Sequence, residues 1–342
     1  MRVHFVTPDL SEVSLTEAEL RDADLETLPT DASEVMSRHG KWVWSLRTHL
    51  ELKRVGYHST AGPSLQPGAI NVGHRDTLRV LLRTGSLLPR SAAVVVCQAD
   101  KPRLWGAGYR VQQCPDRRGI FVPHWPERGL VPRDGSRGNR LENVAFFGLP
   151  PEREMPVHTS LERQLAERGF AYQVNGGPAS WKNYADVDVS VALRSEWRAK
   201  GKWKPASKLQ NAHICGVHFV ATPEPSYTAL DPAQLTWTPA RTVRETIDAI
   251  ETLRSDDSWF DSRPQWLDGV TEESLTQATV DSWVEALEQV LADHAGRPAG
   301  RGYIMRVGYQ AGLGHVQRGA DLIDTRIRAR SARRIALAMV DV

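Results

Sequence analysis

The sequence predicts an α/β fold with two Rossmann-like domains, each built on a parallel sheet. Short, wholly apolar runs alternate with segments of helical length along most of the chain, as is typical of parallel strands buried between helices. A stretch rich in proline, glycine and arginine, at 123–139, divides this alternation into two series. The 342 residues suffice for two domains of about 150 residues each.

The first series predicts a parallel sheet with two covering helices. Residues 37–56 repeat apolar side chains three and four positions apart and end at Gly56, a typical helix terminus. A second helix is expected over 76–85, where Asp76 could cap its start. Residues 11–37 are acidic and weakly periodic, which indicates a loop with a short helix. The expected strands are 3–7, 68–73, 92–100, 110–113 and 119–123.

The second series repeats this pattern and then becomes mostly helical. Its apolar runs predict strands at 143–148, 170–174, 187–194 and 217–222. Helices are expected at 159–169, 206–216, 240–256, 279–296 and 319–339. The sequence thus predicts an N-terminal domain over 1–125, joined by a last helix at 319–342, and a C-terminal domain over 140–300.

Composition and charge narrow the classes of function. The formal net charge is only +2, which argues against a protein that binds nucleic acid. No run of about 18 apolar residues is present, so no membrane-spanning helix is expected, and the N-terminus predicts a strand rather than a signal peptide. The three cysteines are an odd number without metal-ligand spacing, which favours a reducing cytoplasm.

The stretch YADVDVSVALR, residues 184–194, contains an Asp-x-Asp pair of the kind that holds a divalent metal on a diphosphate in some enzymes. In such a site the pair follows its strand, because ligands bind at the carboxyl ends of parallel strands. Here Asp186 and Asp188 precede or begin the apolar run. We therefore expect Asp186 to cap or turn the chain, Asp188 to face a polar neighbour, and neither to bind a metal.

Basic residues follow the same strand at its carboxyl end. Arg194 ends the run, and Lys204 and Lys208 lie near the start of the helix expected at 206–216. Backbone N–H groups and the helix dipole favour an anion at such a start, so the three cations predict a diphosphate site without metal. A solvated, lysine-rich loop is the alternative.

Several motifs, in one order, resemble a known family. The similarity extends from about residue 68 to 228, roughly half of the chain. Over this span the chain resembles the GT-B glycosyltransferases, and is most similar to a group of bacterial glycosyltransferase family 1/4-like proteins. The motifs are His74 to Thr77, Pro123 to Pro126 with Gly129-Leu130 and Pro132 to Asp134, Glu142 to Gly148, Asp186 to Arg194, and Lys204 to Tyr227.

The resemblance implies a GT-B fold, in which two Rossmann-like domains face each other and a C-terminal helix returns to the first. It implies a metal-independent glycosyltransferase that moves a sugar from a nucleoside-diphosphate sugar to an acceptor hydroxyl. No cofactor is implied besides this co-substrate. The acceptor is expected to be a sugar, a lipid-linked molecule or another small molecule; the donor sugar, the base and the oligomeric state stay open.

The resemblance also assigns residues to a donor site in the C-terminal half. Gly148 allows close approach to the backbone after its strand, and Glu224 follows a strand where family members contact the sugar or the diphosphate. Asn211 and Trp203 stand where retaining members carry two glutamates, a departure that leaves the stereochemical outcome open. Asn211 can still hydrogen-bond a ribose hydroxyl. The implied donor residues are Gly148, Arg194, Lys204, Lys208, Asn211 and Glu224.

The N-terminal half is expected to supply the acceptor side. His74 follows a short strand and is interpreted as the general base that deprotonates the acceptor hydroxyl, because its ordinary pKa lies near neutral pH. Asp76 could orient it, although a helix cap needs no such role. Gln98 and Asp100 leave the carboxyl end of the most apolar strand and are expected to line the acceptor side.

Two other functions stay open on this sequence. One is a GT-B-fold enzyme without a sugar acceptor, such as a nucleotide-sugar epimerase. The other is a degenerate transferase that only binds its ligand, because the glutamate pair is absent. The basic helix at 319–339 could contact an anionic membrane surface, or it could brace the first domain.

Overall fold

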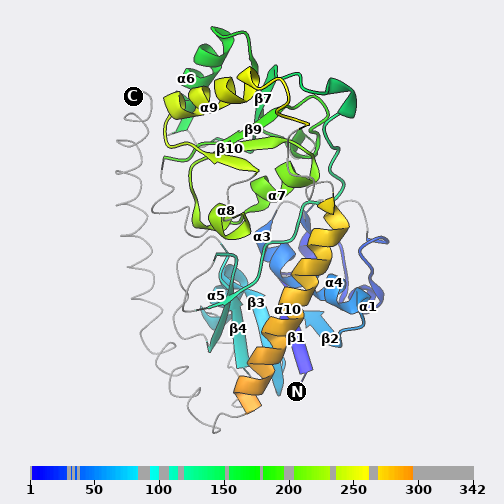
Figure 1. Cartoon of the computed structure of the whole chain (residues 1–342). Coiled ribbons are helices and arrows are strands. Elements are labelled where there is room, and N and C mark those ends of the chain that lie inside the picture. Colours follow the sequence, from blue (N-terminus) through cyan, green and yellow to red (C-terminus); the bar gives the residue numbers. More distant parts are fainter. Residues whose placement is uncertain are drawn as a thin grey trace. The chain divides into compact units, whose positions relative to one another are not determined.

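This computed structural model folds into two compact units, each with its own sheet (Figure 1). The described part of the first unit runs from residue 2 to 123 and from 277 to 295, and that of the second from 124 to 276. The structure describes residues 2–28, 32, 35–36, 39–83, 93–99, 108–114, 119–150, 154–177, 180–195, 204–231, 236–261 and 269–295.

The first unit holds a wholly parallel sheet in the order β2-β1-β3-β4-β5-β6. Five of its strands were predicted from apolar runs. The exception is β2, whose sequence Ser-Thr-Ala-Gly carries no apolar signal because it forms the edge of the sheet. The strands are β1 (Arg2–Val6), β2 (Ser59–Gly62), β3 (Ala69–His74), β4 (Ala93–Cys97), β5 (Tyr109–Gln112) and β6 (Ile120–Phe121).

The predicted helix at 37–56 is built in three parts: α3 (Gly40–Trp42), a π-helical stretch (Val43–Arg47) and α4 (Thr48–Arg54). It ends as expected at Gly56, whose φ of +81° suits glycine. The N–H groups of Gly56 and Tyr57 donate to the carbonyls of Lys53 and Leu52, which closes the last turn as a Schellman motif. This turn leads the chain directly into β2.

The rest of the first unit differs from the sequence predictions at two places. Helix α5 (Arg75–Arg83) starts one residue before Asp76, so Asp76 lies inside the helix and is not its cap. The acidic segment 11–37 contains the expected short helix, α1 (Glu17–Asp22), but it is more than a loop. Its apolar side chains form a buried cluster that includes Leu10, Val13 and Leu20.

Helix α10 (Glu272–Ala295) brings the chain back to the first unit. Its fully buried Trp283 contacts the rings of Phe5 and Trp44 edge-on, with centroids 6.0 and 5.8 Å away. Sequence analysis expected the returning helix at 319–342, which lies outside the described residues.

The second unit holds a wholly parallel sheet in the order β11-β10-β9-β7-β8. Four strands match predicted runs, and the short β11 was missed. The strands are β7 (Asn143–Phe147), β8 (Ala171–Asn175), β9 (Val189–Ala192), β10 (His218–Ala221) and β11 (Trp237–Pro239). The helices of the second unit are α6 (Met155–Ala166), α7 (Ser207–Ile214), α8 (Pro225–Leu230) and α9 (Val243–Ser255). It also has short 3₁₀ turns at Gly135–Arg137 and Ser180–Lys182, and the first unit has one at Leu10–Val13.

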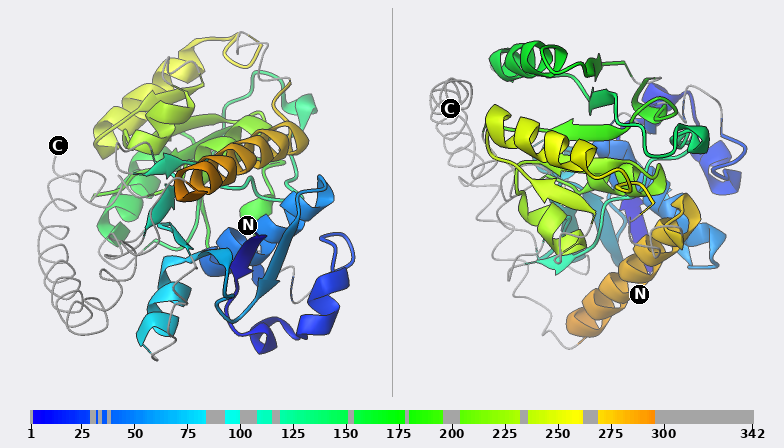
Figure 2. Two further views of the ribbon diagram at one scale, coloured as in Figure 1. Left: turned by 90° about the horizontal axis from the view of Figure 1, so that it is seen from below. Right: turned by 45° about the horizontal axis from the view of Figure 1, so that its top comes forward.

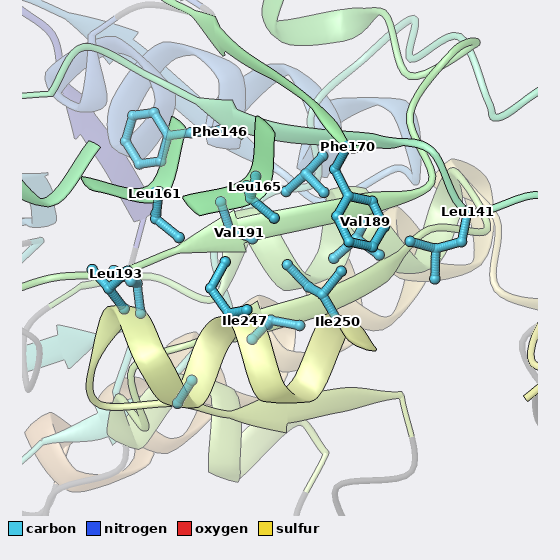
Figure 3. Close-up of a cluster of buried hydrophobic side chains, with 14 of the residues drawn as sticks. Leu141, Phe146, Leu161, Leu165, Phe170, Val189, Val191, Leu193, Ile247 and Ile250 are labelled. Carbon is cyan, nitrogen blue, oxygen red and sulfur yellow. The ribbon is translucent and has the colours of Figure 1, made fainter. Parts of the chain in front are cut away.

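A hydrophobic core fixes this sheet against its helices. Helix α9 packs against both β10 and α6 (Figure 2). The side chains of this core are mostly aliphatic, with Phe146, Phe170 and Trp259 among them, and all are buried, so they hold the strand ends in place. Figure 3 shows the central ones, Leu161 and Leu165 of α6, Val189 and Val191 of β9, and Ile247 and Ile250 of α9.

Strand order defines where ligands are expected. In the second sheet the chain passes from β7 outward to β8 and then to β9 on the other side, so a topological switch point lies between β7 and β9. In the first sheet the corresponding point lies between β1 and β3. Open parallel sheets bind ligands at such points, outside the carboxyl ends of the strands.

The start of α9 allows a direct test of local stability. Thr242 accepts a hydrogen bond from the Glu245 N–H at 3.0 Å, which satisfies one of the unpaired donors of the first turn. We expect Thr242→Ala to lower the free energy of unfolding by about 1 kcal/mol in urea denaturation. The control is Thr252→Ala in the same helix, where the hydroxyl donates only to the Asp248 carbonyl and its loss is close to neutral. Equal effects of the two substitutions would contradict the capping role.

Candidate functional site

The residues predicted for the donor site gather at the switch point of the second sheet. Gly148 follows β7, Arg194 lies two residues after β9, and Glu224 lies three residues after β10 and immediately before α8. Lys208 is the second residue of α7. Three neighbouring strands and one helix therefore deliver these side chains to the same edge of the sheet.

Arg194 and Glu224 form an ion pair in the interior of this edge. The Arg194 Nε donates to Glu224 Oε1 at 2.6 Å, and Glu224 has no exposed surface. Burial raises the pKa of Glu224 even though Arg194 and the two lysines oppose this. Burial alone would lower the pKa of Arg194, but the charges of Glu224, Tyr227 and Glu154, with the hydrogen bond to Glu224, together outweigh it and the pKa rises. The pair fixes the guanidinium, of which a quarter stays exposed.

Lys208 contributes a second, less stable positive charge. Its Nζ lies 4.6 Å from the centroid of the Phe146 ring. Burial, followed by the charges of Arg194 and Lys204, lowers the pKa of Lys208 from 10.5 to about 7. A ligand with negative charge would reverse this shift. An anionic ligand would therefore stabilise the charged form of the Lys208 side chain.

Gly148 provides the space for this ammonium group. A Cβ atom at Gly148 would lie 3.1 Å from Lys208 Nζ, and the φ of +131° is one that other residues rarely adopt. The glycine thus allows Lys208 to approach the backbone after β7, which is the close approach that the sequence predicted at this position.

Several polar atoms at this edge are buried without a hydrogen-bond partner among the described residues. They are Glu224 Oε2, Ser195 Oγ and Ser226 Oγ. The start of α7 adds backbone donors, because Ala206 precedes it and offers no side-chain cap. Buried polar atoms normally have partners, so these three are available to form hydrogen bonds with a ligand at this edge.

Asn211, three residues beyond Lys208, has a different environment. Its side chain lies beside the fully buried Tyr184, whose ring stacks on Phe147. The Asn211 Oδ1 atom is also buried without a partner among the described residues. An interaction between Asn211 and a ribose hydroxyl therefore stays a prediction. Trp203, the other position in the glutamate comparison, lies outside the described residues.

Sequence reasoning missed three residues of this edge. Glu154 precedes α6 and is almost fully buried, and its charge raises the pKa of both Arg194 and Lys208. Ser195 and Ser226 are the other two. Glu154 follows β7 in sequence, so a rule that examines every polar residue after a parallel strand would have found it. Ser226 lies inside the motif that suggested the family.

Asp188 has the structural role that its position predicted. It lies at the amino end of β9 with no exposed surface. Arg133 and Arg137 donate to its carboxylate at 2.8 to 3.0 Å, and the N–H groups of Glu142 and Asn143 donate at 2.9 Å. Asp186 is exposed, and its carbonyl accepts a hydrogen bond from the Asn143 side chain.

The predicted acceptor residues lie in the first unit. His74 is the last residue of β3, at the switch point of its sheet, and is buried. Its Nδ1 accepts the Asp76 N–H at 3.2 Å, while the Asp76 carboxylate pairs with Arg75 at 2.7 Å. Asp76 thus orients His74 through its backbone, and this hydrogen bond favours the neutral tautomer with the proton on Nε2. Gln98 is fully buried after β4, and Asp100 lies outside the described residues.

Other features of the structure concern its cysteines and the apolar character of its helices. The three cysteines, Cys97, Cys114 and Cys215, are buried and form no disulfide. Within the described residues, no helix combines the length and the apolar character needed to cross a bilayer. The basic helix at 319–339 lies outside the described residues.

Comparisons with known proteins find a similarity in structure but not in sequence. No protein-family model and no curated protein matches this sequence. Among solved structures, the chain is similar to AviGT4, a glycosyltransferase involved in avilamycin A biosynthesis. The identity is 12 %, the match covers 73 % of this chain and 88 % of AviGT4, and the TM-score is 0.39. A likeness at this level carries no argument about function.

Proposed function

We propose that this chain is a metal-independent glycosyltransferase whose second unit binds a nucleoside-diphosphate sugar. The observation that supports this most is the cationic pair Arg194 and Lys208 at the switch point between β7 and β9, with Lys208 lying against Gly148. In this proposal the two side chains and the first N–H groups of α7 bind the diphosphate. Lys204 adds positive charge at the same edge.

Positive side chains replace the metal in the proposed chemistry. The bond between the anomeric carbon and the diphosphate oxygen breaks, and a bond from the acceptor oxygen to that carbon forms. Arg194 and Lys208 stabilise the charge that develops on the departing diphosphate. Asp188, the other half of the Asp-x-Asp pair, is fully occupied by two arginines and two backbone donors, which favours this metal-free proposal.

The sugar and the acceptor are assigned less directly. Glu224 Oε2, Ser195 and Ser226 would accept or donate hydrogen bonds to the hydroxyls of the donor sugar. His74 and Gln98 of the first unit remain our proposal for the acceptor side. The acceptor hydroxyl must lose its proton when its oxygen bonds to the anomeric carbon. His74 can take this proton only at Nδ1, and only after the hydrogen bond from the Asp76 N–H is released, because Nε2 carries the proton of the neutral ring.

Binding of nucleoside diphosphates tests this proposal. With UDP, GDP, ADP or dTDP at about 100 times its dissociation constant, the accepted nucleotide should stabilise the folded protein by about 2.7 kcal/mol and raise Tm by about 5 °C. The corresponding monophosphates should give clearly smaller shifts, because they cannot contact both cations. Equal shifts for monophosphates and diphosphates, or none for any, would contradict the proposed site. Hydrolysis or epimerisation of the sugar without an acceptor would favour the epimerase alternative.

A further inference from the structure

The first unit contains a cavity at the edge of its sheet opposite to His74. The cavity has a volume of about 620 Å³ and is lined by the first residues of β1, β2 and β3, Arg2, Ser59 and Ala69, and by the turn after α4. Because these are amino ends of parallel strands, the cavity is separate from the switch point at the carboxyl ends. Neither the predicted donor nor the predicted acceptor residues line it.

The charged side chains that line this cavity are of one sign. Arg2 and Lys53 line it, and none of the described residues that line it is an aspartate or a glutamate. Arg2 forms no ion pair with any described residue, and the Lys53 Nζ donates to the Ala23 carbonyl at 3.0 Å. Two basic side chains, without a carboxylate in the same lining, produce a positive potential inside the cavity.

A buried histidine is among the residues that line the cavity. His49 is 4 % exposed, and its Nδ1 pairs with Ser59 Oγ at 2.8 Å. No described residue forms a hydrogen bond with its Nε2, although the residue lines the cavity. Burial, with the charge of Lys53 and the nearby His4, lowers the pKa of His49 to about 4. The ring is therefore neutral near pH 7, and when the Ser59 hydroxyl donates to Nδ1, the Nε2–H is a donor.

The remaining polar groups of the wall are held in place. His4 is satisfied at both ring nitrogens, by Thr60 Oγ1 and by the Ser64 carbonyl, each at 2.9 Å. Burial and the charge of Glu288 raise the pKa of Tyr57, so its hydroxyl keeps its proton and can donate. Glu288 itself does not line the cavity. The wall thus adds the Tyr57 hydroxyl as a donor, whereas both ring nitrogens of His4 are already occupied.

We propose that this cavity binds a small metabolite through an oxyanion group, either a phosphate or a carboxylate. Arg2 and Lys53 would pair with the oxyanion at the rim, and the Nε2–H of His49 would donate to it from the interior. The volume fits a small molecule rather than a polymer. A ligand at the amino edge would not compete with one at the carboxyl edge, so the two could be bound at the same time.

Two neighbouring cations of α4 provide a matched test. Lys53 and Arg54 are both exposed in the last turn of the helix, but only Lys53 lines the cavity. We expect the full-length protein to bind inorganic phosphate or citrate in isothermal titration calorimetry. Lys53→Gln and Arg2→Gln should each weaken binding about tenfold, because each removes one charge-assisted contact, whereas Arg54→Gln should change it less than about twofold. Better binding of one anion identifies which oxyanion the cavity prefers.

A variant of the second unit separates this site from the proposed donor site. Phosphate could also bind near Lys208, so the titration is repeated with Lys208→Met. Loss of the oxyanion signal in Arg2→Gln and Lys53→Gln, with its retention in Lys208→Met, supports the cavity. The proposal is overturned if neither anion binds at about 10 mM. It is equally overturned if binding is lost in Lys208→Met but unchanged in Arg2→Gln and Lys53→Gln. Either of these results would leave the proposed nucleoside-diphosphate site of the second unit unaffected.

Discussion

Replacing Lys208 with methionine is expected to remove most of the affinity for a nucleoside diphosphate without destabilising the fold. The substitution deletes a charge-assisted contact to the diphosphate, which is worth about 1.5 to 3 kcal/mol, or about 10- to 150-fold in the dissociation constant. Methionine has a similar length and can keep the contact with Phe146. Calorimetric titration of the accepted nucleotide measures the loss, and urea denaturation measures stability.

The lowered pKa of Lys208 also predicts how the stability of the folded protein changes with pH. The pKa of Lys208 falls from 10.5 to about 7 on folding, chiefly because of burial. Between these pH values the unfolded chain binds the extra proton, so this residue makes stability rise with pH across the window. Below about pH 7 the folded protein carries the buried charge and its full cost. Lys208→Met lacks the group, so its stability should be higher than that of the parent at pH 6 and should change less with pH.

Ligand affinity should change with pH in the opposite direction. A diphosphate is bound best when Lys208 is charged, so binding above pH 7 requires uptake of a proton. The affinity of the parent should fall between pH 6.5 and 8.5, and that of Lys208→Met should stay nearly constant. The control is Lys182→Met, which removes an exposed lysine paired with Glu127 at 3.5 Å in the same unit. Equal affinities of Lys208→Met and the parent would exclude Lys208 from the site.

The sequence predicted the parts of the fold that are buried on both faces. Strands such as β4 and β7 are continuous apolar runs, so their position follows directly from the residues. Two of the edge strands, β2 and β11, lack this signal. Ser59–Gly62 is small and polar, and β11 has only three residues, so neither was expected. Helix α10 starts seven residues before the predicted 279, because its first turns are polar and Thr271 and Ser274 stabilise its start by reciprocal hydrogen bonds.

The position of a site residue could be predicted most directly where the residue follows its strand. Arg194 and Gly148 lie just after β9 and β7, so the strand rule alone places them at the switch point. The charge state of Lys208 could not be predicted, because its pKa depends on burial and on Arg194 and Lys204 in space. The position of Glu154 after β7 could have been predicted, but its influence on the pKa values of Arg194 and Lys208 is evident only once the chain has folded.

Asp188→Ala is expected to be the most destabilising single substitution considered for the second unit. The carboxylate is fully buried and holds Arg133, whose guanidinium also lies 4.4 Å from the centroid of the Phe260 ring. Removing the carboxylate leaves Arg133 buried without its counter-charge, and leaves the N–H groups of Glu142 and Asn143 unpaired. Breaking one partner of such a buried pair costs about 3 to 5 kcal/mol. Urea denaturation followed by circular dichroism measures this loss.

The neighbouring aspartate and the pH dependence make the Asp188 prediction specific. Asp186→Ala changes an exposed side chain two residues away and should alter stability by less than about 0.5 kcal/mol. Burial raises the pKa of Asp188, but the hydrogen bonds from Arg137, Glu142, Asn143 and Arg133 outweigh it, so the net pKa is lowered. The stabilisation is therefore complete above the ordinary carboxyl pKa of 3.8 and is lost as pH falls through the lower value in the folded protein. Asp188→Ala should lack this acid-sensitive component. If both alanine variants lost the same small amount of stability, the arginine network would not be what holds the amino end of β9.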